Sequence, residues 1–182
     1  MSEERRPATA VELLTAFKST DLGDLCDAAE AAIADGGGFG WVKKPPRHIM
    51  EAYWKGLLLV PDRHLFAARL DGTIAGSAVL TRPPRNNEAQ AFSANLTGTF
   101  IAPWARGHGL SRQLIERVEE HARALGIEVL NLDVRETQRA AIQVFEALGY
   151  RHWGTHPAYA RVGGALVRGY FYWKPLVAGF EA

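Results

Sequence analysis

The chain has 182 residues and a mass of 20.0 kDa, a size that suits one domain with a sizeable buried core. Its 47% hydrophobic and 23% charged residues are ordinary for a soluble globular protein, and a net charge of +1 argues against a general nucleic-acid-binding surface. The single cysteine excludes a disulfide framework and a cysteine metal cluster, and the lack of a membrane-length apolar run or an apolar leader predicts a cytoplasmic protein.

The beginning of the chain predicts a short tail, a strand and a helix. Residues 1–10 are expected to form a flexible N-terminus, and residues 11–182 a single domain. Val11–Phe17 reads as a strand. Asp21–Asp35 reads as a helix, because its apolar residues fall on one face and Asp21 suits the N-cap position.

A glycine-rich loop with two aromatic residues follows at Gly36–Trp41. The later elements are expected to be helices at 45–59, 110–125 and 138–148 and strands at 65–70, 73–81, 90–101, 129–134, 150–159 and 166–174. Asp71-Gly72 predicts a tight hairpin turn between two of these strands. This order of elements indicates a mixed sheet with helices on both faces.

The turn that precedes the third helix is the most informative part of the chain. Arg106-Gly107-His108-Gly109-Leu110-Ser111 leads directly from a strand ending near Pro103 into an amphipathic helix. Such a turn points unpaired backbone N–H groups and the positive end of the helix dipole at an anion, most often a diphosphate. On spacing alone, a plain helix start with turn glycines explains the run equally well. The run lacks the Gly-Lys-Ser/Thr ending of a triphosphate-binding loop and the spacing of the dinucleotide fingerprint.

Two motifs together resemble the GNAT superfamily of acetyl-CoA-dependent N-acetyltransferases. Arg106-x-x-Gly109-x-Ser111 resembles the diphosphate-binding motif of that family, Gln/Arg-x-x-Gly-x-Gly/Ala. The run Ala141–Tyr150, AIQVFEALGY, resembles the family's later helix, usually Ala-Ile-x-Leu-Tyr-Glu-x-Leu-Gly-Phe. The resemblance covers about residues 67–174 well and the N-terminal third only loosely.

The resemblance implies a GNAT-like α/β fold that binds acetyl-CoA. The central sheet would be mixed and mostly antiparallel, with about six or seven strands, helices on both faces and a V-shaped splay for the cofactor. A β-bulge at Thr97-Gly98-Thr99 would open that splay. The residues that it assigns to the cofactor are Thr99, Phe100, Ile101, Arg106, Gly107, His108, Gly109, Leu110, Ser111, Arg112, Gln138 and Phe145.

Asp133 is the candidate catalytic base, because it lies near the end of the strand that borders the splay in the family. The alternative role for Asp133 is to hold the acceptor's ammonium or to anchor the following loop. Phe145 stands where the family has the tyrosine that commonly protonates the leaving thiolate, and it has no proton to give. Either another group such as Tyr150, Tyr159, Tyr170 or Tyr172 supplies the proton, or the thiolate leaves unprotonated, or the protein is a non-catalytic acetyl-CoA-binding module.

The acceptor is expected to be a small, polar, amino-acid-like primary amine, with protein amino groups as the alternative. The C-terminal run 159–174 and the loop 36–40 are similar to those of tabtoxin-resistance acetyltransferases, which act on such a molecule. Trp41 and Tyr159 are the candidate acceptor-binding residues, since aromatic rings can desolvate an amine or contact its cation. An exposed closing hairpin would suit a homodimer, and no metal is expected.

Overall fold

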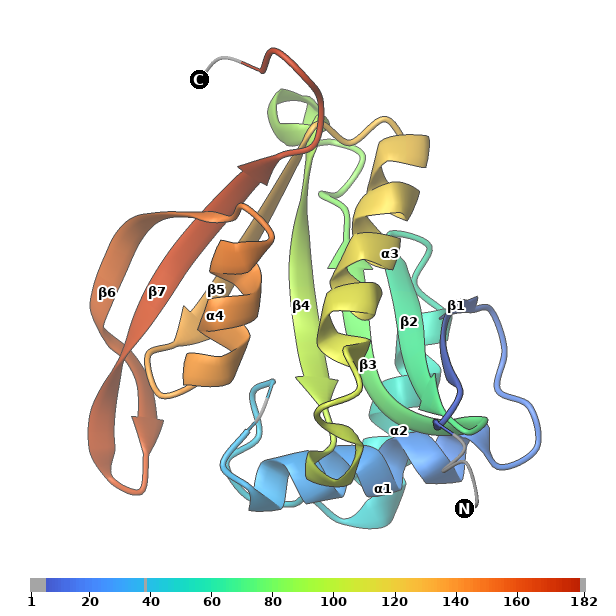
Figure 1. Cartoon of the computed structure of the whole chain (residues 1–182). Helices are drawn as coiled ribbons and strands as arrows, with labels where there is room; N and C mark the ends of the chain where they lie inside the picture. Colours follow the sequence, from blue (N-terminus) through green and yellow to red (C-terminus); the bar gives the residue numbers. More distant parts are fainter. Residues whose placement is uncertain (1–5, 38, 181–182) are drawn as a thin grey trace.

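A seven-stranded sheet crosses the molecule in the order β1-β2-β3-β4-β5-β7-β6 (Figure 1). The structure is a computed structural model that describes residues 6–37 and 39–180. Every neighbouring pair of strands is antiparallel except β4 and β5, which are parallel. The strands are β1 (Thr9–Leu14), β2 (Arg63–Leu70), β3 (Thr73–Thr81), β4 (Ser93–Ile101), β5 (Val129–Arg135), β6 (Arg151–Val162) and β7 (Ala165–Pro175). The predicted fold class, a mixed and mostly antiparallel sheet, is confirmed.

Helices cover both faces of the sheet and divide the core into two clusters. The α-helices are α1 (Asp21–Ala34), α2 (Arg47–Leu58), α3 (Leu110–Ala124) and α4 (Arg139–Ala147), and short 3-10 turns lie at Glu88–Gln90 and Pro103–Ala105. The apolar faces of α1 and α2 pack against one side of β2 to β4, and those of α3 and α4 pack against the other side. The alternation of side chains along each strand supplies both clusters, as in Phe66 and Ala67.

The structure corrects the two predictions made for the start of the chain. The opening strand runs from Thr9 to Leu14 and not from Val11 to Phe17. Asp21 is not the N-cap of α1, because Thr20 holds that position and Asp21 is only 5% exposed. Its carboxylate accepts hydrogen bonds from the Lys18 N–H and the Arg69 guanidinium, at 3.0 and 2.9 Å. Residues 1–5 of the predicted tail and Gly38 of the predicted loop lie outside the described residues.

The predicted bulge in β4 is present. Ser77 of β3 pairs with Phe100 and Val79 pairs with Thr97, so β4 holds one extra residue opposite Ala78. Gly98 takes up the bulge with a φ of 57°, and its carbonyl accepts a hydrogen bond from the buried Ser77 hydroxyl at 3.0 Å. The bulge therefore re-aims the last residues of β4.

Close approach of β3 fixes the bulge from the neighbouring strand. A Cβ added to Gly76 would lie 2.2 Å from the Phe100 carbonyl oxygen and 2.7 Å from the Ile101 Cδ1. No side chain fits at position 76 unless the backbone of β4 moves away. Glycine at this position is therefore a requirement of the strand pairing.

β4 and β5 pair over only three residues and then separate. The pairs run from Ser93 with Val129 to Asn95 with Asn131, although β4 continues to Ile101 and β5 to Arg135. Beyond that point β5 pairs with β7 and β4 with β3, and Figure 1 shows the two parallel strands diverging. This divergence is the predicted splay, and it leaves one edge of the outer half of β4 unpaired among the described strands.

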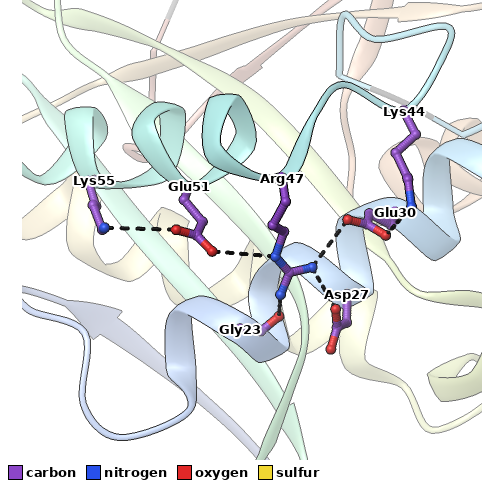
Figure 2. Close-up of polar contacts among 7 residues, drawn as sticks. All are labelled: Gly23, Asp27, Glu30, Lys44, Arg47, Glu51 and Lys55. Carbon is purple, nitrogen blue, oxygen red and sulfur yellow. Dashed lines mark hydrogen bonds and ion pairs between the residues drawn. The ribbon is translucent and has the colours of Figure 1, made fainter.

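A cluster of charged side chains joins α1 to α2. The guanidinium of Arg47 contacts Asp27 at 2.6 Å, Glu30 at 3.2 Å and the Gly23 carbonyl at 2.9 Å (Figure 2). Lys44 also contacts Glu30 at 2.9 Å, and Glu51 of α2 lies 3.5 Å from Arg47. Single exposed ion pairs contribute little to the free energy of unfolding, but a network on one arginine fixes the two helices relative to each other.

Two histidine rings meet where α3 packs on β2. His121 Nε2 and His64 Nδ1 are 3.1 Å apart, so one ring donates a hydrogen bond to the other. Burial lowers the pKa of both rings from 6.5, and the charge of His121 lowers that of His64 further. The folded protein therefore resists protonation of this pair more than the unfolded chain does.

We expect the melting temperature to be constant above about pH 7 and to fall as the pH drops below about 6.5, because the unfolded chain then binds more protons than the folded one. Melting curves between about pH 7 and pH 5 measure the effect, since carboxylates such as Asp21, whose pKa Arg69 lowers, titrate below this range. The variant His64→Gln should flatten the dependence, whereas His48→Gln, which replaces an exposed histidine, should not. An equally steep fall in His64→Gln would contradict the assignment.

None of the helices in the described part of the chain combines the length and the apolar character that crossing a membrane requires.

Candidate active site

The turn before α3 presents a row of unpaired backbone donors. Gly107 and Gly109 both have left-handed backbones, with φ of 84° and 73°, and Gly109 is the N-cap of α3. Within the described part of the chain, the N–H groups of residues 107–112 have no hydrogen-bond acceptor, and the first N–H bonded along the helix is that of Gln113 to the Gly109 carbonyl at 3.2 Å. Six consecutive donors at a helix N-terminus form a strong anion-binding cradle.

The side chains around this turn differ in their ion-pair partners and in their exposure to solvent. Arg106 forms an ion pair with Asp35 of the α1 C-cap, at 2.7 Å, and both side chains are about half exposed, at 49% and 47%. Arg112 pairs with Glu116 one helical turn later, at 2.8 Å. His108 is exposed, as expected, whereas Leu110 is buried in the core and contributes only its backbone.

The bulged end of β4 carries the three predicted residues Thr99, Phe100 and Ile101. Phe100 and Ile101 are 8% and 7% exposed and belong to different core clusters, on opposite faces of the sheet. Their side chains are therefore structural, as expected, and only the backbone of this segment is available to a ligand. Thr99 lies in the bulge with a partly exposed side chain.

An aromatic cluster packs on Phe100 from the side of α1 and α2. The ring of Phe39 stacks on Phe100 with a centroid distance of 4.9 Å, and it meets Trp41 edge to face at 5.3 Å. Tyr53 contacts Trp41 at 5.0 Å and Trp54 at 4.9 Å. Trp41, a predicted acceptor-binding residue, is thus connected to the bulged strand through Phe39.

The other arm of the splay carries Asp133 and Tyr159, which the structure brings together. The Tyr159 hydroxyl donates a hydrogen bond to Asp133 Oδ2. Burial and the Asp133 carboxylate both raise the pKa of Tyr159, so the phenol stays protonated and remains a donor. Asp133 itself is exposed on β5, between the buried Leu132 and Val134.

The ring of Tyr159 reaches Asp133 because β7 has a glycine beneath it. A Cβ added to Gly169 would lie 2.1 Å from Tyr159 Cγ. A register shift in β6 between His156 and Ala160 places Tyr159 at this point, and its ring also meets Phe171 edge to face at 5.9 Å. Gly169 was not among the predicted site residues, although a glycine inside a strand pattern signals close approach.

Gln138 and Phe145 occupy different surroundings in and before α4. Gln138 is the N-cap of α4, and its side-chain amide donates to the Gly36 carbonyl at 3.0 Å. Phe145 is 5% exposed and packs edge to face on Tyr150 at 5.6 Å. The ring of Phe145 therefore leaves little surface to a ligand, and it carries no proton donor.

Two of the tyrosines that were considered as proton donors, Tyr172 and Tyr150, are buried in the protein. Burial and then Glu146 raise the pKa of Tyr172 to about 12, and its hydroxyl donates to that carboxylate at 2.9 Å. Tyr150 is 4% exposed in the core, and burial is the main cause that raises its pKa. Tyr159 is the one whose hydroxyl reaches a candidate catalytic group.

The structure thus gathers the predicted residues on two arms. One arm holds the β4 bulge, Arg106 and the unpaired amides, and the other holds Asp133, Tyr159 and Gln138. Trp41 lies with the helices α1 and α2, and within the described residues no ring contact joins it to Tyr159. The turn after α1 contacts both arms, through Asp35 and Gly36, and nothing in the local sequence pattern predicts these contacts.

Comparisons with known proteins agree on one family. A sequence model of the acetyltransferase (GNAT) family matches residues 30–150. An uncharacterised N-acetyltransferase in the hisH-hisA intergenic region of Azospirillum brasilense is 65% identical over 129 residues, which are 71% of this chain and 77% of that protein. The N-alpha-acetyltransferase RimI of Mycobacterium tuberculosis is 30% identical over 108 residues, 59% of this chain and 65% of that protein.

A solved structure shows the same fold with a ligand. The structure of yncA from Salmonella typhimurium, which contains its cofactor acetyl-CoA, matches with a TM-score of 0.74 and 16% identity over 94% of this chain and 95% of that one. At this identity the likeness concerns the fold.

Proposed function

The chain belongs to the acetyltransferase (GNAT) family, and from this premise we propose that it acetylates a primary amine of a small, polar, amino-acid-like acceptor by direct transfer within a ternary complex. Membership makes it an N-acetyltransferase that uses acetyl-CoA. The observation that carries the proposal is the row of unpaired amides at residues 107–112, next to the unpaired edge of β4.

The residues present fit coenzyme A. The amides of residues 107–112 and the Arg106 guanidinium suit its diphosphate, because both supply donors to a dianion and a Cβ added at Gly107 would meet nothing within 4 Å. The unpaired edge of β4 at Thr99–Ile101 suits an extended chain with amide groups, which can pair with a strand edge. When bound, acetyl-CoA supplies an acetyl group activated as a thioester.

Asp133 would receive the acceptor's amine. Its exposed carboxylate can hold the acceptor's ammonium and orient a water chain, through which the proton that the amine loses can pass to bulk solvent. The hydrogen bond from Tyr159 fixes the orientation of the carboxylate, which makes Tyr159 a positioning residue as well as a candidate contact for the acceptor. The aromatic cluster with Trp41 would form the opposite, apolar wall.

The reaction can proceed without a protein acid at the thiolate. Phe145 has no proton to donate, and Tyr172 and Tyr150 are held in the core. A thiol has a pKa of about 8.5, so a thiolate is a tolerable leaving group near neutral pH and can take its proton from water. We therefore assign no residue to that step.

Release of free thiol from acetyl-CoA in the presence of candidate acceptors tests the function. We expect turnover with small amino-acid-like amines that exceeds turnover with peptides bearing a free N-terminus or a lysine. Selective acetylation of peptide N-termini would instead favour the alternative acceptor, a protein amino group, which the name of the N-alpha-acetyltransferase RimI suggests. Cofactor binding without turnover across the whole panel would contradict the proposed reaction and favour a binding module.

We also propose that the protein forms a homodimer and is located in the cytoplasm. The edge strand β6 supports the first, because it pairs only with β7 among the described strands, and the hairpin exposes Trp153 and Leu166 by 64% and 57%. Analytical ultracentrifugation measures the oligomeric state, and a monomer at every concentration would contradict the dimer.

A further inference from the structure

Asp35 forms an ion pair with Arg106, the cation that the proposed function assigns to the diphosphate. Its carboxylate lies 2.7 Å from the Arg106 Nη1, immediately before the row of unpaired amides. The two residues are 71 positions apart in the sequence, and neither side chain forms another hydrogen bond or ion pair within the described residues. The negative charge of Asp35 thus lies beside the proposed site of the doubly charged diphosphate.

The backbone around Asp35 strengthens this negative potential. Asp35 is the C-cap of α1, so it lies at the negative end of that helix dipole. The α3 N-terminus, which carries the opposite partial charge, begins just after Arg106. Arg106 therefore neutralises the end of one helix while it stands at the entrance to the other.

Gly36, the next residue in the chain, contacts the second arm of the splay. The Gly36 carbonyl accepts a hydrogen bond from Gln138, another polar residue that the family resemblance assigns to coenzyme A. Two successive residues after α1 thus contact one cofactor-binding side chain on each side of the splay. A diphosphate that enters the cradle competes with Asp35 for Arg106.

We propose that Asp35 sets the affinity for coenzyme A by acting as an internal anion that Arg106 exchanges for the diphosphate. The inference rests on the proposed function, because it takes Arg106 as a diphosphate ligand. Acetyl-CoA and the product coenzyme A carry the same diphosphate, so Asp35 weakens the binding of both and favours product release. Asp35 is a positioning residue, since it acts through Arg106.

Calorimetric titration with coenzyme A tests the exchange in four proteins: wild type, Asp35→Asn, Arg106→Ala and the double variant. We expect Asp35→Asn to lower the dissociation constant about three- to tenfold, in line with a partly screened charge close to a dianion. In the Arg106→Ala background the same substitution should change the dissociation constant less than about twofold, because the competed cation is gone. The control Glu88→Gln removes one exposed negative charge far from the turn and should have no effect.

Unchanged or weaker binding by Asp35→Asn would overturn the proposal, since the aspartate would then hold Arg106 in place for the ligand. An equal gain in both backgrounds would also overturn it, because the effect would be a general charge effect without exchange. Failure of the wild-type protein to bind coenzyme A would instead contradict the proposed function. Product inhibition by coenzyme A gives a second measurement, and its inhibition constant should fall with the dissociation constant.

Discussion

Replacing Gly109 with aspartate is expected to abolish binding of coenzyme A, with a loss of about 100-fold or more in affinity. The new carboxylate would stand at the N-cap of α3, in front of the amides that are left without acceptors. It would repel a diphosphate and satisfy some of the same donors itself. Titration of the purified variant with coenzyme A measures the loss.

Two controls separate charge from backbone strain. Gly109 has a φ of 73°, so any side chain at this position carries a conformational cost. Gly109→Ala introduces the conformational cost without a negative charge and should retain measurable binding of coenzyme A. Gly164→Asp places the same side chain at a φ of 84° in the β6–β7 turn, where a Cβ meets nothing within 4 Å, and should bind normally. Retained affinity in Gly109→Asp would contradict the placement of the diphosphate.

Replacing Asp133 with asparagine is expected to lower kcat about 100- to 10,000-fold, which is the usual contribution of a residue that moves a proton in the transition state. Asparagine has nearly the same shape and can still accept the hydrogen bond from Tyr159, so the fold and that contact should persist. The dissociation constant for acetyl-CoA should stay within about twofold, because the carboxylate lies on the arm opposite the amide row.

The control for Asp133 lies next to the start of the same strand. Glu128 is exposed just before β5 begins, and Glu128→Gln removes an equal charge at the far end of that strand. It should leave kcat unchanged. If Asp133→Asn raises the KM for the acceptor and leaves kcat intact, Asp133 binds the ammonium and does not take part in proton transfer.

The sequence predicted the sheet and the cradle because both depend on local patterns. Asp71-Gly72 specifies its hairpin by turn chemistry, and both residues have the positive φ that such a turn needs. The resemblance to the GNAT family implied the bulge at Thr97-Gly98-Thr99, and the glycines before α3 indicated the unpaired amides. Each of these features involves residues that are close together in the chain.

The contacts missed by the sequence reasoning join distant segments. Arg106 pairs with Asp35, and Gln138 with Gly36 across 102 residues, and no periodicity relates such positions. The error at Asp21 has the same origin. Local rules predicted that Asp21 caps the helix, but in the structure it is the buried partner of Arg69 from β2. Long-range partners decide what a polar side chain does once it is folded.

The glycine at position 76 limits how this enzyme can be redesigned. Gly76 lies against the Phe100 carbonyl, so the direction in which the bulged strand offers its peptide groups is determined by the backbone of a neighbouring strand. Substitutions in the aromatic rings or the hairpin can reshape the space for a new acceptor without disturbing that alignment. Moving the point of acyl transfer itself would require two strands to be rebuilt together.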